Sequence, residues 1–190
     1  MRIIAGEFRG RIVASPPGET TRPITDRVKA ALFNILMPRL EGAVVLDLFC
    51  GTGSMGLEAL SRGSVYAAFA ELDRPALAGL DRNIAALRLA DRCRVWRGDI
   101  LAELPGWMAG LDCPADIAFI DPPYAMVREW DWAEAARQLF DPVAASLAPD
   151  GIAMLRVPRA LAVPQQVGQL TVIRRREYGT MALVFLARQQ

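Results

Sequence analysis

Apolar and polar residues alternate along this chain in blocks that predict strands and helices in turn from residue 43 onward. Continuous apolar runs, such as residues 43–48 and 115–120, are typical of strands buried on both faces of a sheet. Helices are expected from the glycine-rich turn to about Arg62 and over residues 75–89 and 130–147. The expected strands cover residues 43–48, 65–71, 93–96, 115–120, 152–157, 170–177 and 181–187.

Repeated strand–helix units predict an α/β fold with a mostly parallel sheet that carries helices on both faces. The last two expected strands are joined through Tyr178-Gly179 and should close this seven-stranded, Rossmann-like sheet as an antiparallel hairpin. The residues before the first strand differ, because residues 2–15 could form a small hairpin and Thr25 is expected to cap a helix that Pro38 stops. We therefore expect an N-terminal extension over residues 1–40 and a main domain over residues 41–190.

Composition adds an uneven charge distribution to this picture. The chain of 190 residues is 53% hydrophobic and 23% charged, as expected for one globular domain, and its formal charge is only +1. Residues 1–39, however, contain seven basic and three acidic residues, an excess of four positive charges that leaves the remainder at about −3. A basic segment on a near-neutral body is consistent with phosphate contact, and equally with a solvated arginine-rich surface.

Several classes of site and location are disfavoured by the residues that the sequence lacks. It has no histidine, and its three cysteines, Cys50, Cys93 and Cys113, are widely spaced, so we expect neither a zinc site nor a histidine-based catalytic triad. No stretch reads as a signal peptide and no apolar run approaches 18 residues. A metal-free cytoplasmic protein, not embedded in a membrane, is therefore expected.

A glycine-rich loop follows the first expected strand. Gly51, Gly53 and Gly56 form a GxGxxG pattern, with Glu71 twenty residues after the first glycine, which matches the dinucleotide-binding fingerprint. Asp47, four residues before the loop, would repel a pyrophosphate but suits the ammonium and sulfonium groups of S-adenosylmethionine. The charge argument favours the methyl donor.

The residues after the next strands are candidates for the adenine end of such a ligand. Asp99 follows the third strand and could accept a hydrogen bond from the adenine amino group, while Ile100 packs on the ring and Leu72 flanks its other face. The alternative for Asp99 is a helix N-cap.

The tetrapeptide Asp121-Pro122-Pro123-Tyr124 follows the fourth strand, where open parallel sheets bind ligands. Its prolines offer carbonyl acceptors and no backbone donors. Asp121 and the carbonyl of Pro122 could both accept from one amino group, and Tyr124 offers a ring on which a base can stack. This arrangement predicts methylation of an exocyclic amino group, since positioning can supply most of the catalysis.

The chain also resembles a known family, the RsmD-type bacterial 16S rRNA guanine-N2 methyltransferases, over nearly its full length. The strings that carry the resemblance are residues 1–11 (MRIIAGEFRGR), 21–28 (TRPITDRV), 31–36 (ALFNIL), 45–53 (VLDLFCGTG), 56–63 (GLEALSRG) and 121–124 (DPPY). Two positions depart from the family pattern. Cys50 stands where alanine is expected, and Arg156 stands where the family often has an acidic residue, so no function is assigned to Arg156.

The resemblance implies a class I methyltransferase fold, S-adenosylmethionine as methyl donor, and a guanine of 16S rRNA, or of the assembling small subunit, as acceptor. It also implies a basic N-terminal extension that contacts RNA; we further expect a monomer. The expected site residues are Asp121, Pro122, Pro123 and Tyr124 for catalysis; Asp47, Phe49, Gly51, Thr52, Gly53, Glu71, Leu72, Asp99 and Ile100 for the donor; and Arg9, Arg11, Arg22 and Arg27 for RNA.

Three alternatives remain open at this point. The tetrapeptide is shared with adenine-N6 methyltransferases of DNA or RNA, so it does not choose the base. The glycine fingerprint alone would also suit a nicotinamide-dependent oxidoreductase. A non-catalytic RNA-binding assembly factor could keep the same pocket.

Overall fold

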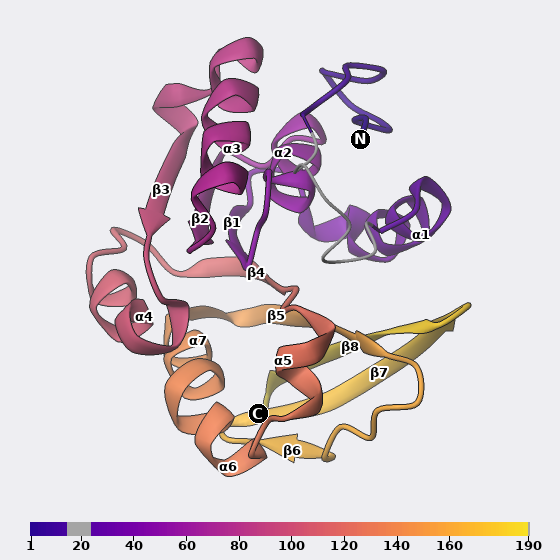
Figure 1. Cartoon of the computed structure of the whole chain (residues 1–190), viewed down its shortest axis with the longest axis vertical. Helices are drawn as coiled ribbons and strands as arrows, with labels where there is room; N and C mark the ends of the chain where they lie inside the picture. The colour runs from indigo at the N-terminus through magenta and orange to yellow at the C-terminus, as the bar shows by residue number, and fades with distance from the viewer. Residues whose placement is uncertain (15–23, 190) are drawn as a thin grey trace.

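The computed structural model describes residues 1–14 and 24–189, and its centre is one eight-stranded sheet. The strand order is β3-β2-β1-β4-β5-β8-β7-β6. Neighbours from β3 to β5 run parallel, whereas β8, β7 and β6 are antiparallel additions at one side (Figure 1). The strands are β1 Val44–Leu48, β2 Tyr66–Glu71, β3 Cys93–Arg97, β4 Ala115–Ile120, β5 Leu147–Pro158, β6 Gln166–Val167, β7 Leu170–Tyr178 and β8 Met181–Arg188.

Helices cover both faces of this sheet, because successive strand residues point to opposite sides and both sets are apolar. One face packs against α1, α2 and α3, and the other against α4, α5, α7 and the helical turns before α7. The helical segments are α1 Asp26–Leu36, η1 Met37–Arg39, α2 Ser54–Ser61, α3 Arg74–Leu87, η2 Ala90–Arg92, α4 Ile100–Ala109, α5 Tyr124–Arg128, α6 Trp132–Ala135, the π-helical turn η3 Ala136–Phe140 and α7 Asp141–Ser146.

The predicted α/β fold with a mostly parallel sheet is confirmed, and three local differences have physical reasons. The eighth strand, β6, has two residues and exists only through its pairing with β7. Helix α4 was not expected, since Pro105 and Gly106 lie within it, but Leu104 and Met108 are buried against the sheet, and this packing outweighs local propensity. The helix expected over residues 130–147 is divided by the π-helical turn η3.

The N-terminal segment, residues 1–14, turns back on itself and packs against the α1–α3 face. The residues expected to pair as a hairpin make one isolated antiparallel bridge, between Arg2 and Ile12. Ile3 and Val13 are buried in the same core as α1, α2 and α3. As expected, Thr25 caps α1 by accepting from the backbone N–H of Val28.

A buried carboxylate holds this segment in place. Glu58 of α2 is fully buried, and its side chain accepts hydrogen bonds from the backbone N–H groups of Ile4 (2.8 Å) and Ala5 (3.1 Å). It also forms ion pairs with Lys29 of α1 (3.2 Å) and Arg62 (2.8 Å). One side chain therefore joins the N-terminal segment, α1 and α2. In the described part of the chain, no helix is both long and apolar enough to cross a membrane.

Candidate active site

Polar residues gather where β1, β2 and β4 end, at the carboxyl edge of the parallel strands. β1 lies between β2 and β4 in the sheet order, and Asp47 is in register with Phe69 of β2 and Phe119 of β4. The backbone N–H of Asp121 donates to the carbonyl of Leu48 (3.1 Å). Residues far apart in the sequence, Asp47 and Asp121, thus face one edge, which is where open α/β sheets bind ligands.

The loop between β1 and α2 leaves space for a ligand. Phe49 has φ of +60°, a conformation that is uncommon for a non-glycine residue and is frequent at functional sites. Gly51 also has a positive φ (+56°), and a Cβ placed there would meet nothing within 4 Å. Gly53 caps α2, and at Gly56 a Cβ would overlap the ring of Phe69, so this glycine allows α2 to approach β2 closely.

Asp47 is buried beneath this loop, with 1% of its surface exposed. Its Oδ2 accepts from the N–H of Gly56 (2.8 Å), whereas its Oδ1 has no hydrogen-bond partner among the described residues. Burial raises the pKa of Asp47 well above its ordinary value, and the negative charges of Asp121 and Glu71 raise it further. Because an unpartnered buried carboxylate oxygen is costly, this position suits a cationic ligand that supplies a donor.

Glu71, at the end of β2, also binds the loop. Its Oε2 accepts from the N–H of Gly51 (2.8 Å), and its Oε1 accepts from the N–H groups of Leu72 (2.8 Å) and Asp73 (2.9 Å). Two carboxylates, Asp47 and Glu71, therefore occupy loop amides that would otherwise point at an anionic ligand. The loop is built for a ligand without a pyrophosphate at this point.

The residues expected at the adenine end have different surroundings. Leu72 is 62% exposed and can be covered by a ligand, whereas Ile100 is buried in the core and has little surface left to offer. Asp99 is the N-cap of α4, accepting from the N–H of Leu101 (3.0 Å), so the alternative interpretation of this residue holds in the structure. A cap uses one carboxylate oxygen and leaves the second for another donor.

Thr52 and a residue that the sequence analysis did not select, Asn83, stabilise the loop from behind. The Thr52 side chain is buried and packs next to Gly79 of α3. Asn83 Nδ2 donates to the carbonyl of Thr52 (2.9 Å), while its Oδ1 accepts from the N–H of Ala14 (2.8 Å). Asn83 therefore connects the glycine loop to the N-terminal segment; the only signal in the sequence is an amide on the apolar face of a helix.

The tetrapeptide leads from β4 into α5. Pro123 is the N-cap of α5, and its carbonyl accepts from the N–H of Val127 (3.1 Å), so the Pro122 carbonyl is not part of the helix. The side chain of Asp121 is 16% exposed. Its pKa is raised by burial and lowered, to a smaller extent, by the charge and hydrogen bond of Arg156.

Arg156 of β5 is the principal site residue that sequence reasoning missed. Its Nε donates to Asp121 Oδ1 at 2.5 Å, and its guanidinium lies 5.5 Å from the centre of the Tyr124 ring. Only 3% of Arg156 is exposed. The available signal was a single charged residue inside the apolar run of residues 152–157.

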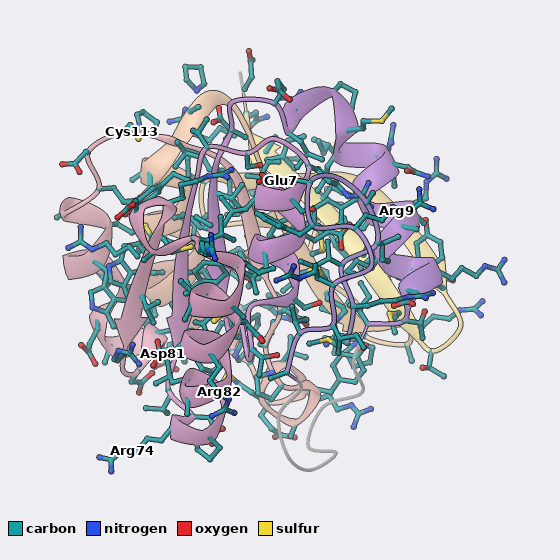
Figure 2. All side chains as sticks on the ribbon, turned by 90° about the horizontal axis from the view of Figure 1, so that it is seen from above. Glu7, Arg9, Arg74, Asp81, Arg82 and Cys113 are labelled. Atoms are coloured by element: carbon teal, nitrogen blue, oxygen red, sulfur yellow. The ribbon has the colours of Figure 1, made fainter. Side chains whose placement is uncertain are left out.

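The arginines expected to contact RNA are not gathered at this edge. Arg22 lies outside the described residues. Arg9 is exposed on the N-terminal loop (Figure 2), and Arg11 donates to the carbonyl of Ala86 (3.1 Å) near the end of α3, away from the edge where α3 begins. Arg27 is exposed in the first turn of α1, one turn before the face where Lys29 approaches Ser54 (3.4 Å), the first residue of α2. Arg27 is thus nearer than Arg11 to the glycine loop.

Among the residues that the structure describes, no cluster of three or more histidine, cysteine or acidic side chains could hold a metal ion. The parallel strand order, the glycine loop after β1 and the acidic residues at the strand ends define the class I methyltransferase fold. Residues 1–187 match the family described as "Conserved hypothetical protein 95", and the chain belongs to this family, which confirms the resemblance to the RsmD proteins.

Named relatives agree with this membership. The chain is 34% identical over 179 residues to "Putative rRNA methyltransferase YlbH" of Bacillus subtilis, with 94% of each protein covered. It is 40% identical over 124 residues to "Ribosomal RNA small subunit methyltransferase D" of Escherichia coli strain K12, covering 65% of this chain and 60% of the relative. A solved structure, "Putative methyltransferase yhhF from Escherichia coli", superposes with a TM-score of 0.81 at 32% identity, covering 100% of this chain and 98% of the other.

Proposed function

We propose that this protein uses S-adenosylmethionine to methylate the exocyclic N2 amino group of a guanine in 16S rRNA. The observation that carries the proposal is the buried Asp47 carboxylate, with one oxygen unpartnered among the described residues, at the same strand edge as Asp121. The first suits a cationic methyl donor, and the second suits an amino group that accepts the methyl. The proposed substrate follows from the family and from the names of its members.

The residues around the glycine loop fit the donor. Asp47 would bind its cationic methionine end, and the open side of Gly51, next to Phe49 and Gly53, leaves room for it. Glu71 already accepts three backbone hydrogen bonds and retains acceptor capacity for ribose hydroxyls. The adenine end is assigned to Leu72, Asp99 and Ile100, with Leu72 offering most of the apolar surface and Thr52 contributing its backbone.

The tetrapeptide would hold the acceptor. Asp121 and the Pro122 carbonyl accept from the two N–H groups of one amino group, Pro123 fixes the turn, and the Tyr124 ring carries the base. When bound, the donor supplies a methyl carbon whose bond electrons remain with its sulfur as the new carbon–nitrogen bond forms. Asp121 stabilises the positive charge that develops on the nitrogen, and the surplus proton leaves through this carboxylate to water.

We assign 16S rRNA, or the assembling small subunit, as the partner, and residues 1–40 as an RNA-contacting extension on the domain of residues 41–190. Arg27 would contact RNA near the acceptor nucleotide. Arg9 and Arg11 would contact phosphates further away, together with Arg22. The protein would act as a monomer in the cytoplasm.

The structure provides an argument against the oxidoreductase alternative. In a dinucleotide site the loop amides bind a pyrophosphate. Here Glu71 and Asp47 accept from the amides of Gly51 and Gly56, so a pyrophosphate would have to displace two carboxylates of its own charge. Adenine-N6 methylation and a non-catalytic assembly role are distinguished by the experiment.

The test is transfer of tritiated methyl from S-adenosylmethionine to small ribosomal subunits that lack the modification, followed by nucleoside analysis. We expect N2-methylguanosine. Asp121→Ala should lower kcat by about 100-fold or more because positioning is lost, with donor binding by calorimetry largely unchanged. Asp81→Ala, which removes a half-exposed ion pair with Arg97, is the matched control and should behave as wild type. Labelled N6-methyladenosine, or no transfer by the wild-type protein, would contradict the proposal.

A further inference from the structure

Arg156 brings a positive charge into an edge that otherwise carries carboxylates. β5 lies next to β4 in the sheet, and Leu155 is in register with Ile120, so Arg156 and Asp121 follow each other's strand neighbours directly (Figure 1). The pair is nearly enclosed: side-chain exposure is 4% for Arg156 and 16% for Asp121. A buried arginine placed against the residue proposed to accept the substrate amino group demands a role beyond surface charge.

We propose that Arg156 is a positioning residue for methyl transfer: it holds Oδ1 of Asp121 and lies over the Tyr124 ring, thereby fixing both side chains that the acceptor base would contact. This inference rests on the proposed function. With Oδ1 bound to Arg156, the other carboxylate oxygen and the Pro122 carbonyl remain as two acceptors for the two hydrogens of one amino group. The guanidinium, 5.5 Å from the ring centre, restricts the ring plane through a cation–π contact.

The charges around Asp121 give Arg156 a second task. Asp47 on β1 and Glu71 at the end of β2 lie on the same edge, and both interact unfavourably with a further negative charge there. Tyr124 of α5 and Arg156 of β5 are the other polar groups against Asp121. Burial raises the pKa of Asp121, and Arg156 opposes this increase. A protonated Asp121 would donate a hydrogen bond instead of accepting one, so loss of Arg156 should impair transfer most at low pH.

Three variants test the proposal. Arg156→Met removes the charge and the hydrogen bond at similar length, and Arg156→Lys keeps the charge without the planar fork. Arg188→Met is the control, because Arg188 also donates from the sheet to a backbone carbonyl, that of Leu147 (2.9 Å), at the opposite end of β5. The measurements are kcat and KM for donor and small subunit as functions of pH, and the titration of the Asp121 carboxyl by NMR with ¹³C-labelled aspartate, assigned with Asp121→Asn.

For Arg156→Met we expect kcat to fall by about 100-fold at neutral pH, a smaller change in donor KM, and an acid limb of the rate profile shifted to higher pH together with the Asp121 titration. Arg156→Lys should keep the acid limb near that of wild type while kcat remains reduced. Arg188→Met should match wild type in every measurement.

Several outcomes would overturn the proposal. One is an Arg156→Met protein with wild-type kcat and acid limb; another is an equal loss at every pH with unchanged Asp121 titration, which indicates a structural defect alone. If Arg156→Met does not fold, wild-type kcat in Arg156→Lys would overturn it. The NMR titration needs no turnover, so it tests Arg156 even if the wild-type protein transfers no methyl and the proposed function fails.

Discussion

Replacing Glu58 by glutamine tests how the N-terminal segment is held on the methyltransferase fold. The substitution keeps the shape of the side chain but removes the charge that pairs with Lys29 and Arg62. Arg62 retains some contact with solvent, with 11% of its side chain exposed, whereas Lys29 is 3% exposed and would keep an uncompensated charge in the core. Breaking a buried pair by removing one partner costs about 3–5 kcal/mol.

Such a loss is large for a protein of 190 residues. Domain stabilities are about 5–15 kcal/mol, and each kcal/mol corresponds to about 2–4 °C in Tm at this size, so Glu58→Gln should lower Tm by about 6–20 °C. The free energy of unfolding is measured by urea denaturation followed by circular dichroism. Hydrogen exchange should also accelerate at Ile4 and Ala5, whose N–H groups donate to Glu58.

The control is Asp81→Asn, which breaks an ion pair with Arg97 that is about half exposed on both sides. Because solvent screens such a pair, we expect a change of about 0–1 kcal/mol. A loss for Glu58→Gln within this range, with unchanged exchange at Ile4 and Ala5, would refute the reasoning, since it would mean that the buried network makes no net contribution to stability.

Three further predictions concern the donor loop and the RNA. Gly56→Ala should destabilise the protein by about 1–3 kcal/mol through overpacking against β2 and weaken donor binding, whereas Gly106→Ala, where a Cβ meets nothing within 4 Å, should stabilise it slightly; urea denaturation of both variants decides. The pKa of Asp47 is raised above its ordinary 3.8, and a cationic donor binds the ionised form, so donor affinity measured by calorimetry should increase as pH rises above that value. Asp47→Asn should be weak and independent of pH; a wild-type affinity that falls with rising pH would exclude a cation at this carboxylate. Replacing Arg9 and Arg11 together by glutamine should weaken RNA binding and reduce the salt dependence by about one phosphate contact each, and unchanged RNA affinity would show that the N-terminal loop does not contact RNA.

The fold was largely predictable from the sequence because its signals are local. Continuous apolar runs indicated the parallel strands, and the glycine-rich and proline-rich turns indicated where two of them end. The sequence analysis missed α4 because Pro105 and Gly106 interrupt its pattern, and only the burial of Leu104 and Met108 against the sheet makes this segment helical. It missed β6 because a two-residue strand has no signal apart from its partner.

The site divides in the same way. The sequence by itself determined the glycine loop, the acidic residue before it and the tetrapeptide, since each lies within a few consecutive residues whose backbone chemistry is legible. Only the tertiary structure decided which side chains meet: Arg156 reaches Asp121, 35 residues away, because β4 and β5 are neighbours in the sheet. It also placed Arg11 near the far end of α3, away from the carboxyl edge. Strand order and the packing of helices on the sheet set these distances, and no local pattern of residues encodes them.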